Sequence, residues 1–337
     1  MIRLQDIADM AGVSRTTVSN VLYGKTKKVS QATIDKVTQL LKEHGYVPNM
    51  ASMVLNGQGS KLIGFVQGYQ SAHGMDAFQD LFVGKLLSVI QREASEKGFY
   101  VILIDGSSNE KVIDIASRWD VDGLIILGYP EKQYRDLKKK LNKKMILLDT
   151  YPENGYDFYN VGVDDYSGGF QVGNYLRQCG FEKALFLAET GDASDLYRWQ
   201  GFKQAMEMNA KFCSKSRYIR IDTQKERRLK QYEEMLPQFL QAGALAFSSD
   251  YNAIEAMNFF YDKGIKVPEE ISIVGYDDSL YAEYVRPRLT TVRQNVEEKG
   301  KIAFKILHML IRGQAVEDYN IKNSVKLIRR ESVRETF

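Results

Sequence analysis

The sequence is poor in cysteine, histidine and proline, and it has no long apolar run. It holds two cysteines, Cys179 and Cys213, and three histidines. Two isolated thiols without metal-ligand spacing predict neither a disulfide framework nor a zinc site, and they suit a reducing cytoplasm. No stretch reaches the length of a membrane span, and the first residues, M-I-R-L-Q-D, lack the apolar region of a secretion signal. We therefore expect a cytoplasmic protein that has no bound metal and does not contact a membrane.

The motifs of several enzyme classes are also missing. The sequence contains no H-E-x-x-H, G-x-S-x-G, G-x-x-x-x-G-K or G-x-G-x-x-G. These spacings would place the catalytic or phosphate-binding groups of metalloproteases, serine hydrolases, P-loop proteins and dinucleotide enzymes. We expect a binding protein with no catalytic residue and no cofactor. An enzyme with the same fold is the alternative.

Residues 2–22 have the spacing of two short helices joined by a tight turn. Gly12 stands where a helix must end, because glycine adopts a left-handed conformation without a side-chain clash. Ser14 stands where the N-cap of the next helix belongs. The predicted apolar stripes are Leu4, Ile7, Ala8 and Ala11 in the first helix and Val18, Val21 and Leu22 in the second.

The other face of the second helix is polar. It carries Arg15, Thr16, Thr17, Ser19 and Asn20. Short hydrogen-bonding side chains and one guanidinium are what a recognition helix uses on base edges and phosphates in a major groove. The stretch therefore predicts a helix-turn-helix. Two amphipathic helices of an ordinary helical domain are the alternative.

The distribution of charge favours nucleic acid as a partner. Residues 1–59 contain seven Lys or Arg and four Asp or Glu, whereas the remaining residues hold 39 of each sign. The whole net charge of +3 thus belongs to the N-terminal segment, with Lys25, Lys27 and Lys28 just after the candidate recognition helix. A local cationic surplus is typical of a DNA-binding module, although such a cluster also occurs in solvated loops.

A third helix and a short fourth one complete the N-terminal segment. Ser30 is a candidate N-cap of the third helix, and Gly45 follows its end. The stretch from Pro48 to Gly57 has room for about two helical turns, which are too few to be stable alone. Its apolar side chains, including Leu55, have no evident core to enter. This pattern predicts a hinge helix that inserts an apolar wedge into a minor groove. A plain linker is the alternative.

Beyond Ser60, short apolar strands alternate with helices. A first series of strands comprises residues 62–66, 100–104, 123–127 and 145–148, and a second comprises 160–163, 184–187, 218–221, 244–247 and 271–274. Continuous apolar strands between helices predict parallel sheets covered on both faces, here in two doubly wound lobes. Asp149, Asp250 and Asp277 lie in the loops that follow strands, which is the edge where such sheets bind ligands.

Six motifs in one order resemble the lactose-repressor (LacI) family of bacterial transcription regulators over essentially the whole chain. They are D-I-A-D-M-A-G-V-S-R-T-T-V-S at 6–19, G-Y-V-P-N at 45–49, V-D-G-L-I-I at 121–126, I-S-I-V-G-Y-D-D at 271–278, R-P-R-L-T-T-V at 286–292 and L-I-R-R-E-S at 327–332. The resemblance implies a homodimer, an all-α helix-turn-helix headpiece on a pseudo-palindromic operator, and an α/β body like the periplasmic sugar-binding proteins. It also implies that the chain crosses between the lobes three times.

The resemblance divides the chain as follows. We expect a headpiece at 1–46, a hinge helix and linker at 47–60, a first lobe at 61–160 and 292–320, and a second lobe at 161–291 and 321–337.

The resemblance also implies roles for single residues. Arg15, Thr16 and Asn20 match base-reading positions, Thr17 and Ser19 match phosphate-contacting positions, Asn49 belongs to the matched G-Y-V-P-N at the start of the hinge, and Leu55 matches the minor-groove leucine. Two departures are that Asn20 replaces a frequent arginine or histidine, and that Met53 and Asn56 make the hinge less cationic than is usual.

In the body, the residues matched to effector contacts are Asp149, Arg198, Asp250, Asp277 and Gln294, to which we add Trp199 beside Arg198 and Phe78 with His73 after the first strand. Carboxylates, one arginine and aromatic faces suit a neutral polyol such as a sugar, whose hydroxyls donate and accept. An Asp after a strand is also a common helix N-cap, which is the alternative for Asp250.

We therefore expect a ligand-responsive regulator, a repressor, that binds double-stranded DNA as a homodimer and a small polar effector, a sugar or sugar derivative, between its lobes. A body that senses a partner protein or a nucleobase is the alternative.

Overall fold

In the computed structural model, the described residues are 2–57, 59–68, 80–151, 158–191, 193–208 and 217–335, except for the side chains of residues 50 and 51. They form two compact units, residues 1–61 and 62–337. Within the described residues, no helix is both long and apolar enough to cross a membrane.

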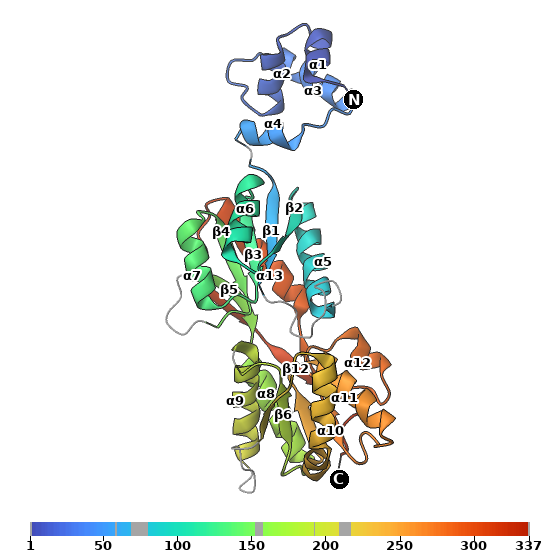
Figure 1. The fold of residues 1–337 in the computed structure, drawn as a ribbon. Coiled ribbons are helices and arrows are strands. Elements are labelled where there is room, and N and C mark those ends of the chain that lie inside the picture. The colour runs from blue at the N-terminus through green and yellow to red at the C-terminus, as the bar shows by residue number, and fades with distance from the viewer. Residues whose placement is uncertain are drawn as a thin grey trace. The chain divides into compact units, whose positions relative to one another are not determined.

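The N-terminal unit is a small helical domain (Figure 1). Its helices are α1 (Leu4–Ala11), α2 (Arg15–Leu22), α3 (Gln31–Glu43) and α4 (Met50–Leu55). The caps lie where the sequence predicts them: Ser14 and Ser30 accept hydrogen bonds from the backbone of their helices, and Gly12 ends α1 with a φ of 70°. All four predicted apolar residues of α1 are buried, together with Val18 and Val37. The predicted helix-turn-helix is therefore present.

The first lobe of the body is a six-stranded parallel sheet with helices on both faces (Figure 1). In the order β11-β5-β4-β3-β1-β2, its strands are Asn320–Asn323, Tyr159–Val163, Lys144–Leu148, Gly123–Leu127, Leu62–Gln67 and Tyr100–Asp105. One face packs on α5 (Leu81–Glu96) and α13 (Val296–Ile311), and the other packs on α6 (Asn109–Arg118) and α7 (Glu131–Lys140).

The second lobe has a four-stranded parallel sheet in the order β7-β6-β8-β9. These strands are Tyr218–Arg220, Leu185–Ala188, Ala244–Phe247 and Ser272–Val274. Helices α8 (Asp165–Gln178) and α9 (Ala193–Glu207) cover one face. Helices α10 (Lys225–Ala242), α11 (Asp250–Asp262) and α12 (Leu280–Tyr284) cover the other.

The chain passes between the lobes at three places. The first is between β5 and α8, the second is between β10 (Thr291–Gln294) and α13, and the third is between β11 and β12 (Val325–Ile328). Strands β10 and β12 pair antiparallel with each other, and the Asp164 N–H donates to the carbonyl of Asn323. Three crossings agree with the arrangement that the resemblance implies.

Two strands lie in a different lobe from the one that the sequence predicts. We expected residues 160–163 to begin the second lobe and the segment after residue 320 to return to it, but β5 and β11 both lie in the sheet of the first lobe. They pair parallel with each other, Asn160 opposite Asn320, so that β11 covers β5 and forms the edge of the sheet. The apolar pattern identifies a strand without identifying its sheet, which is why the expected division is shifted by a few residues.

Candidate functional site

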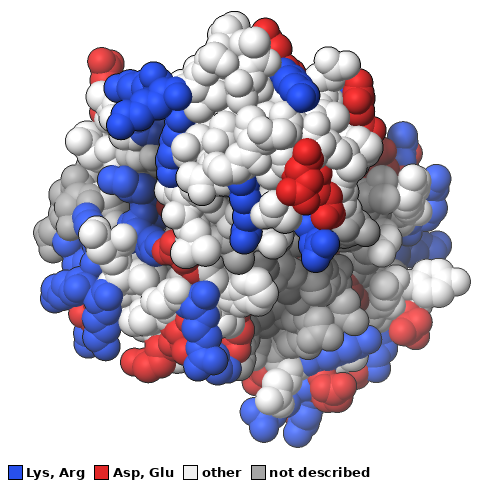
Figure 2. Space-filling view, turned by 90° about the horizontal axis from the view of Figure 1, so that it is seen from above, with Lys and Arg blue, Asp and Glu red and all other residues white. Residues whose placement is uncertain are grey.

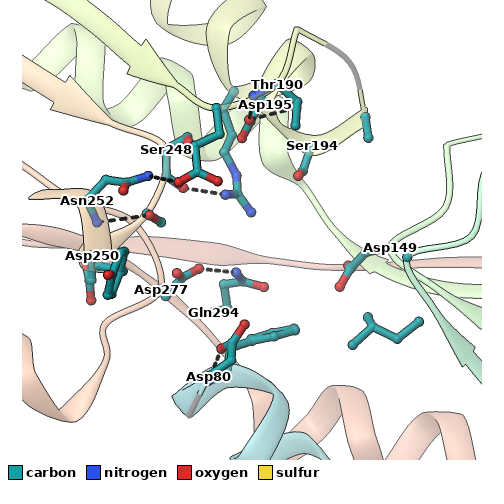
Figure 3. Close-up of a pocket in the computed structure, with 18 of the residues that line it drawn as sticks. Asp80, Asp149, Thr190, Ser194, Asp195, Ser248, Asp250, Asn252, Asp277 and Gln294 are labelled. Carbon is teal, nitrogen blue, oxygen red and sulfur yellow. Dashed lines mark hydrogen bonds between the residues drawn. The ribbon is translucent and has the colours of Figure 1, made fainter. Parts of the chain in front are cut away.

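A cleft of about 2230 Å³ lies between the two lobes. Residues that follow the parallel strands form its walls, among them Asp149 after β4, Ser248 after β8 and Asp277 after β9. Figure 3 shows Asp80 and Asp149 on the side of the first lobe, facing Asp195, Ser248 and Asn252 across the cleft. This is the carboxyl-end edge at which open parallel sheets bind ligands.

Arg198 lies in the wall of the second lobe and its charge is already balanced. Its Nε donates to Asp165 Oδ1 (2.7 Å), and its Nη1 donates to the carbonyl of Ser248 (2.6 Å). The guanidinium lies over the ring of Tyr276, 3.7 Å from its centroid. Burial raises the pKa of the Asp165 carboxyl, while the positive charge of Arg198 opposes that rise. The site therefore offers guanidinium donors without an uncompensated positive charge.

Two glycines allow this ion pair to form. A Cβ on Gly169 in α8 would lie 1.8 Å from the carbonyl oxygen of Arg198, and a Cβ on Gly201 in α9 would lie 1.9 Å from that of Tyr166. Any side chain there would force the two helices apart. Because the backbones touch, Asp165 at the start of α8 reaches Arg198 in α9.

Asp277 and Gln294 form the second polar group of the cleft. Gln294 Nε2 donates to Asp277 Oδ1 (2.6 Å), as Figure 3 shows. Burial raises the pKa of Asp277 to about 8, Arg198 opposes this rise, and Asp250 adds to it. Asp277 has a φ of 117°, a conformation that residues other than glycine rarely adopt.

Asp149, in the first lobe, is paired with a lysine that we did not single out from the sequence. Lys299 of α13 has no exposed surface, and its Nζ lies 2.7 Å from both oxygens of Asp149. The sequence signal is weak but present, since Lys299 follows Val296 by three residues and precedes Ala303 by four, on the buried face of the helix.

Asp250 lines the cleft, but its carboxylate oxygens accept hydrogen bonds from other residues of the protein. The Thr291 hydroxyl donates to its Oδ1, and the N–H of Ser279 donates to its Oδ2 (2.6 Å). Ser249, and not Asp250, caps α11. Burial raises the pKa of Asp250 to about 7, and the hydrogen bonds from Thr291 and Ser279 oppose this rise. The N-cap alternative for Asp250 is therefore wrong, but both oxygens of its carboxylate accept hydrogen bonds from within the protein.

The prediction that Trp199 belongs to the effector site is wrong. Trp199 does not line the cleft, and its ring packs in the lobe core against Phe186, Phe202 and Tyr218. Successive residues of a helix point about 100° apart, so the neighbour of a cleft-facing arginine turns away from it. Its neighbour on the other side, Tyr197, does line the cleft. Phe78 and His73 lie outside the described residues.

A buried ion cluster in the second lobe is also absent from the prediction. Arg228 of α10 donates to both carboxylate oxygens of Glu255 (2.6 and 3.0 Å) and to Glu189 (3.3 Å). Asn252 Nδ2 donates to the same Glu189 oxygen (3.2 Å). Glu189, Asn252 and Glu255 line the cleft. Arg228 lies in α10, Glu189 follows β6, and Asn252 and Glu255 lie in α11, so that no single motif of the sequence contains all four. Among the described residues, no group of side chains has the composition of a metal site.

The candidate DNA-contacting residues lie on the face of α2 away from the core. Arg15 and Thr16 are exposed, Thr17, Ser19 and Asn20 are half-buried, and Val18 between them is buried. The Thr17 hydroxyl is hydrogen bonded to that of Ser14 (2.9 Å) at the N-cap. Figure 2 shows Lys and Arg side chains interspersed with Asp and Glu on the face that it draws.

Helix α4, the predicted hinge helix, is held to α2 and its following turn by polar contacts. Asn49 caps it by accepting from the N–H of Ser52 (2.8 Å). The buried Tyr23 hydroxyl bonds the Ser52 hydroxyl (2.6 Å), and Lys25 Nζ donates to Asn56 Oδ1 (3.3 Å). Leu55, by contrast, is 87% exposed. A large apolar side chain left in water at the end of a short helix is available to a partner.

Two family descriptions match the chain. "Bacterial regulatory proteins, lacI family" matches residues 3–49, and "Periplasmic binding protein-like domain" matches residues 174–333. The HTH-type transcriptional repressor PurR of Proteus mirabilis (strain HI4320) is 30% identical over 346 residues, which cover 99% of this chain and 97% of that protein.

Solved structures with the same fold include regulators bound to DNA and to a sugar. The lac repressor dimer bound to operator and the anti-inducer ONPF is 24% identical, with a TM-score of 0.82 over 98% of each chain. The complex of the transcriptional regulator CelR with cellobiose is 25% identical, with a TM-score of 0.73 over 98% of this chain and 100% of that one.

Proposed function

The chain belongs to the LacI family of ligand-responsive, DNA-binding transcription repressors, and from this premise we propose that its effector is a neutral sugar bound in the cleft between the lobes. We propose further that it binds a pseudo-palindromic operator as a homodimer, through the α2 face that carries Arg15 and through Leu55 of α4. It is not an enzyme.

The observation that carries the sugar proposal is the internal neutralisation of Arg198. Because Asp165 already balances its charge, an anionic ligand gains little from it, whereas a hydroxyl can still accept a hydrogen bond from the guanidinium. Asp277, when it is ionised, supplies the complementary acceptor. Neutral polyols need this mixture of donors and acceptors.

A relative with a known ligand supports a sugar over a nucleobase. The aromatic side chains that line the cleft, among them Tyr151, Tyr197 and Tyr251, can pack against either kind of ligand and do not decide between them. The cellobiose complex of CelR shows that a relative of this fold takes a sugar.

The cleft is larger than a small ligand fills, since typical small-molecule sites have about 300–1,000 Å³. We therefore expect the lobes to close on the effector. Because the effector and the operator then both bias the states of one body, they influence each other.

A thermal-shift panel tests the proposal. Cellobiose, D-ribose, their phosphorylated counterparts, adenine and hypoxanthine are compared at equal concentration, since a ligand that binds only the folded state raises Tm. We expect a rise with a neutral sugar, loss of that rise in Asp277→Asn, and its retention in Arg118→Ala, an exposed substitution on α6. A rise with a nucleobase alone, or capture of a partner protein without any small-molecule response, would contradict the sugar proposal. Sedimentation at micromolar concentration tests the homodimer separately. A monomer at that concentration would contradict the proposed homodimer.

A further inference from the structure

Lys299 is fully buried behind the wall of the cleft and does not line the cleft itself. Its Nζ lies 2.7 Å from Asp149 Oδ1 and Oδ2 and 3.1 Å from Gln294 Oε1, with the ring of Phe82 centred 4.9 Å away. An ammonium has three hydrogens to donate, and these three acceptors use all of them. A buried charge needs such pairing, because an unpaired one is costly.

The contact with Lys299 fixes the orientation of the Gln294 side chain. An ammonium has no acceptor, so only the carbonyl end of the amide can face it. The amide nitrogen is then directed to Asp277 Oδ1, 2.6 Å away. The two ends of an amide are nearly equivalent in shape, so its hydrogen-bond partners decide which way it points. Here the Lys299 ammonium and the Asp277 carboxylate both favour the same orientation of the Gln294 amide.

The oriented amide determines what the cleft presents to a ligand. Among the described residues, Gln294 Nε2 and the Asp277 carboxylate make one side-chain hydrogen bond, to each other. The second Nε2 hydrogen and Asp277 Oδ2 are left to act on a ligand, and both residues line the cleft. When the Asp277 carboxyl is ionised, a hydroxyl accepts from the first and donates to the second, whereas a carbonyl or ether oxygen can do only the former.

We propose that Lys299 is a positioning and specificity-determining residue of the effector cleft, which holds the Gln294 amide nitrogen toward Asp277 so that this part of the cleft selects a hydroxyl group. The inference rests on the proposed function in that it assumes an effector bound at Asp277. It adds a residue that lies behind the binding surface and acts through Gln294.

The test needs no ligand, so its failure and the failure of the sugar proposal are distinguishable. The Asp277 carboxyl is titrated by carbon-13 NMR in the full-length protein and in Lys299→Met/Asp149→Asn, which removes the ion pair without changing net charge. Without Lys299 the amide is free to turn its oxygen to Asp277, where it accepts from the protonated carboxyl. We expect the midpoint of the titration to rise by about one pH unit, as for the loss of one hydrogen bond to a charged group.

Two comparisons separate this role from a general electrostatic one. Lys143→Met/Asp120→Asn removes a 2.6 Å ion pair on the outside of the same lobe and should leave the midpoint in place. Gln294→Met should raise the midpoint by itself, and combining it with Lys299→Met/Asp149→Asn should add nothing, because both changes remove the same hydrogen bond. Fully additive effects, or an unmoved midpoint in the folded double variant, would overturn the proposal.

A measurement on the unmodified protein covers the case in which the double variant does not fold. The side-chain NH₂ of Gln294 should exchange slowly with water, and its nitrogen-15 shift should follow the titration of Asp277. Rapid exchange, or a nitrogen-15 shift that does not change as Asp277 titrates, would show that the amide is not held as proposed.

Discussion

At the scale of single residues, the two candidate effector contacts, Asp277 and Arg198, differ in how much they contribute to the stability of the fold. Asp277 has one oxygen available, and its neutral analogue keeps the shape of the side chain. Arg198 is 8% exposed, and its partner Asp165 is 2% exposed. Truncation of Arg198 therefore does more than remove a ligand contact, because it leaves a buried carboxylate without its counter-charge.

We accordingly predict that Arg198→Met destabilises the protein by about 3–5 kcal/mol, the usual cost of breaking one side of a buried pair. Arg198→Met/Asp165→Asn should recover most of that loss, because neither charge then remains. Urea denaturation of the two variants measures the difference. If the single variant is as stable as the unmodified protein, the pair does not carry the structural role that its burial indicates.

The raised pKa of Asp277 predicts a pH dependence of stability. Its folded-state value of about 8 exceeds the ordinary 3.8, since burial and the Asp250 charge favour the protonated form. Between these values the folded state holds a proton that the unfolded state has lost, so stability is present at acid pH and is lost as pH rises through 8. The advantage of the unmodified protein over Asp277→Asn should fall from pH 5 to 8 and then level off.

Asp105 provides a control of opposite sign. The hydrogen bond from Lys111 lowers its pKa to about 2, so its contribution is lost as pH falls. Denaturation curves for Asp105→Asn should therefore approach those of the unmodified protein at acid pH, where those of Asp277→Asn diverge. A flat difference curve for Asp277→Asn from pH 5 to 9 would contradict the assigned shift.

Residue-level prediction from sequence succeeded where a residue's neighbours are local. The caps Ser14 and Ser30 are fixed by the following turn, and spacing alone locates them. Trp199 was misplaced because adjacency in sequence is not adjacency on a helix surface. The partner of Arg198 lies 33 residues earlier in the chain, and the contact between α8 and α9 that brings Asp165 there depends on tertiary packing.

At the scale of elements, the two helices that carry the candidate DNA contacts have different stability. Helix α2 packs Val18 into the headpiece core, whereas α4 is six residues long and is tied on by Ser52 and Asn56. So short a helix has little stability of its own. We therefore expect the order of α4 to depend on a partner.

Arg15→Ala tests the recognition helix. Arg15 is exposed and lies in the first turn of α2, so its loss should leave the fold intact. If it reads a base edge, the variant should bind the operator about 1–3 kcal/mol more weakly and lose discrimination at one position per half-site. Binding to a library of operator variants measures this. A uniform loss across all sequences would assign Arg15 to the phosphates instead.

Leu55→Ala tests the apolar wedge. At 87% exposure the side chain contributes little to the fold, and a surface change usually alters stability by less than about 0.5 kcal/mol. Operator affinity should fall while affinity for random DNA stays nearly constant, because the Leu55 side chain can insert only into a bent, partly unstacked site. Val47→Ala is the matched control, since Val47 is 78% exposed and lies outside α4. Equal losses on both DNAs would favour the linker alternative.

The strands show a limit of prediction at this scale. Alternation of apolar runs and helices predicted every strand of the first lobe except β11, which has the polar sequence Asn320–Asn323. It sits at the sheet edge beside β5, where one neighbour suffices. A strand that pairs on one side and is only half-buried need not be apolar, so hydropathy carries no signal for it.

At the scale of the whole body, the contacts near the crossings join the effector cleft to both lobes. The β10 strand pairs with β12, its Val292 carbonyl accepts from the N–H of Asp277, and its last residue, Gln294, meets Lys299 of the first lobe. A ligand at Asp277 thus acts where the chain passes from one lobe to the other. The sequence predicted the crossings by resemblance, but the buried lysine that spans this one is a property of the folded chain.

Coupling between the two ligands should be reciprocal. If the sugar identified in the thermal-shift panel changes operator affinity by some factor, the operator must change sugar affinity by the same factor, because both are linked through one set of states. Typical coupling is about 1–3 kcal/mol, or 5–150-fold. Calorimetric titration of the sugar with and without saturating operator measures the change in sugar affinity. Titration of the operator with and without sugar measures the change in operator affinity. In Leu55→Ala the factor should shrink on both sides together if α4 communicates the state of the body. A factor of one on both sides would mean that sugar binding does not influence operator binding, and the cleft would then not be the regulatory site.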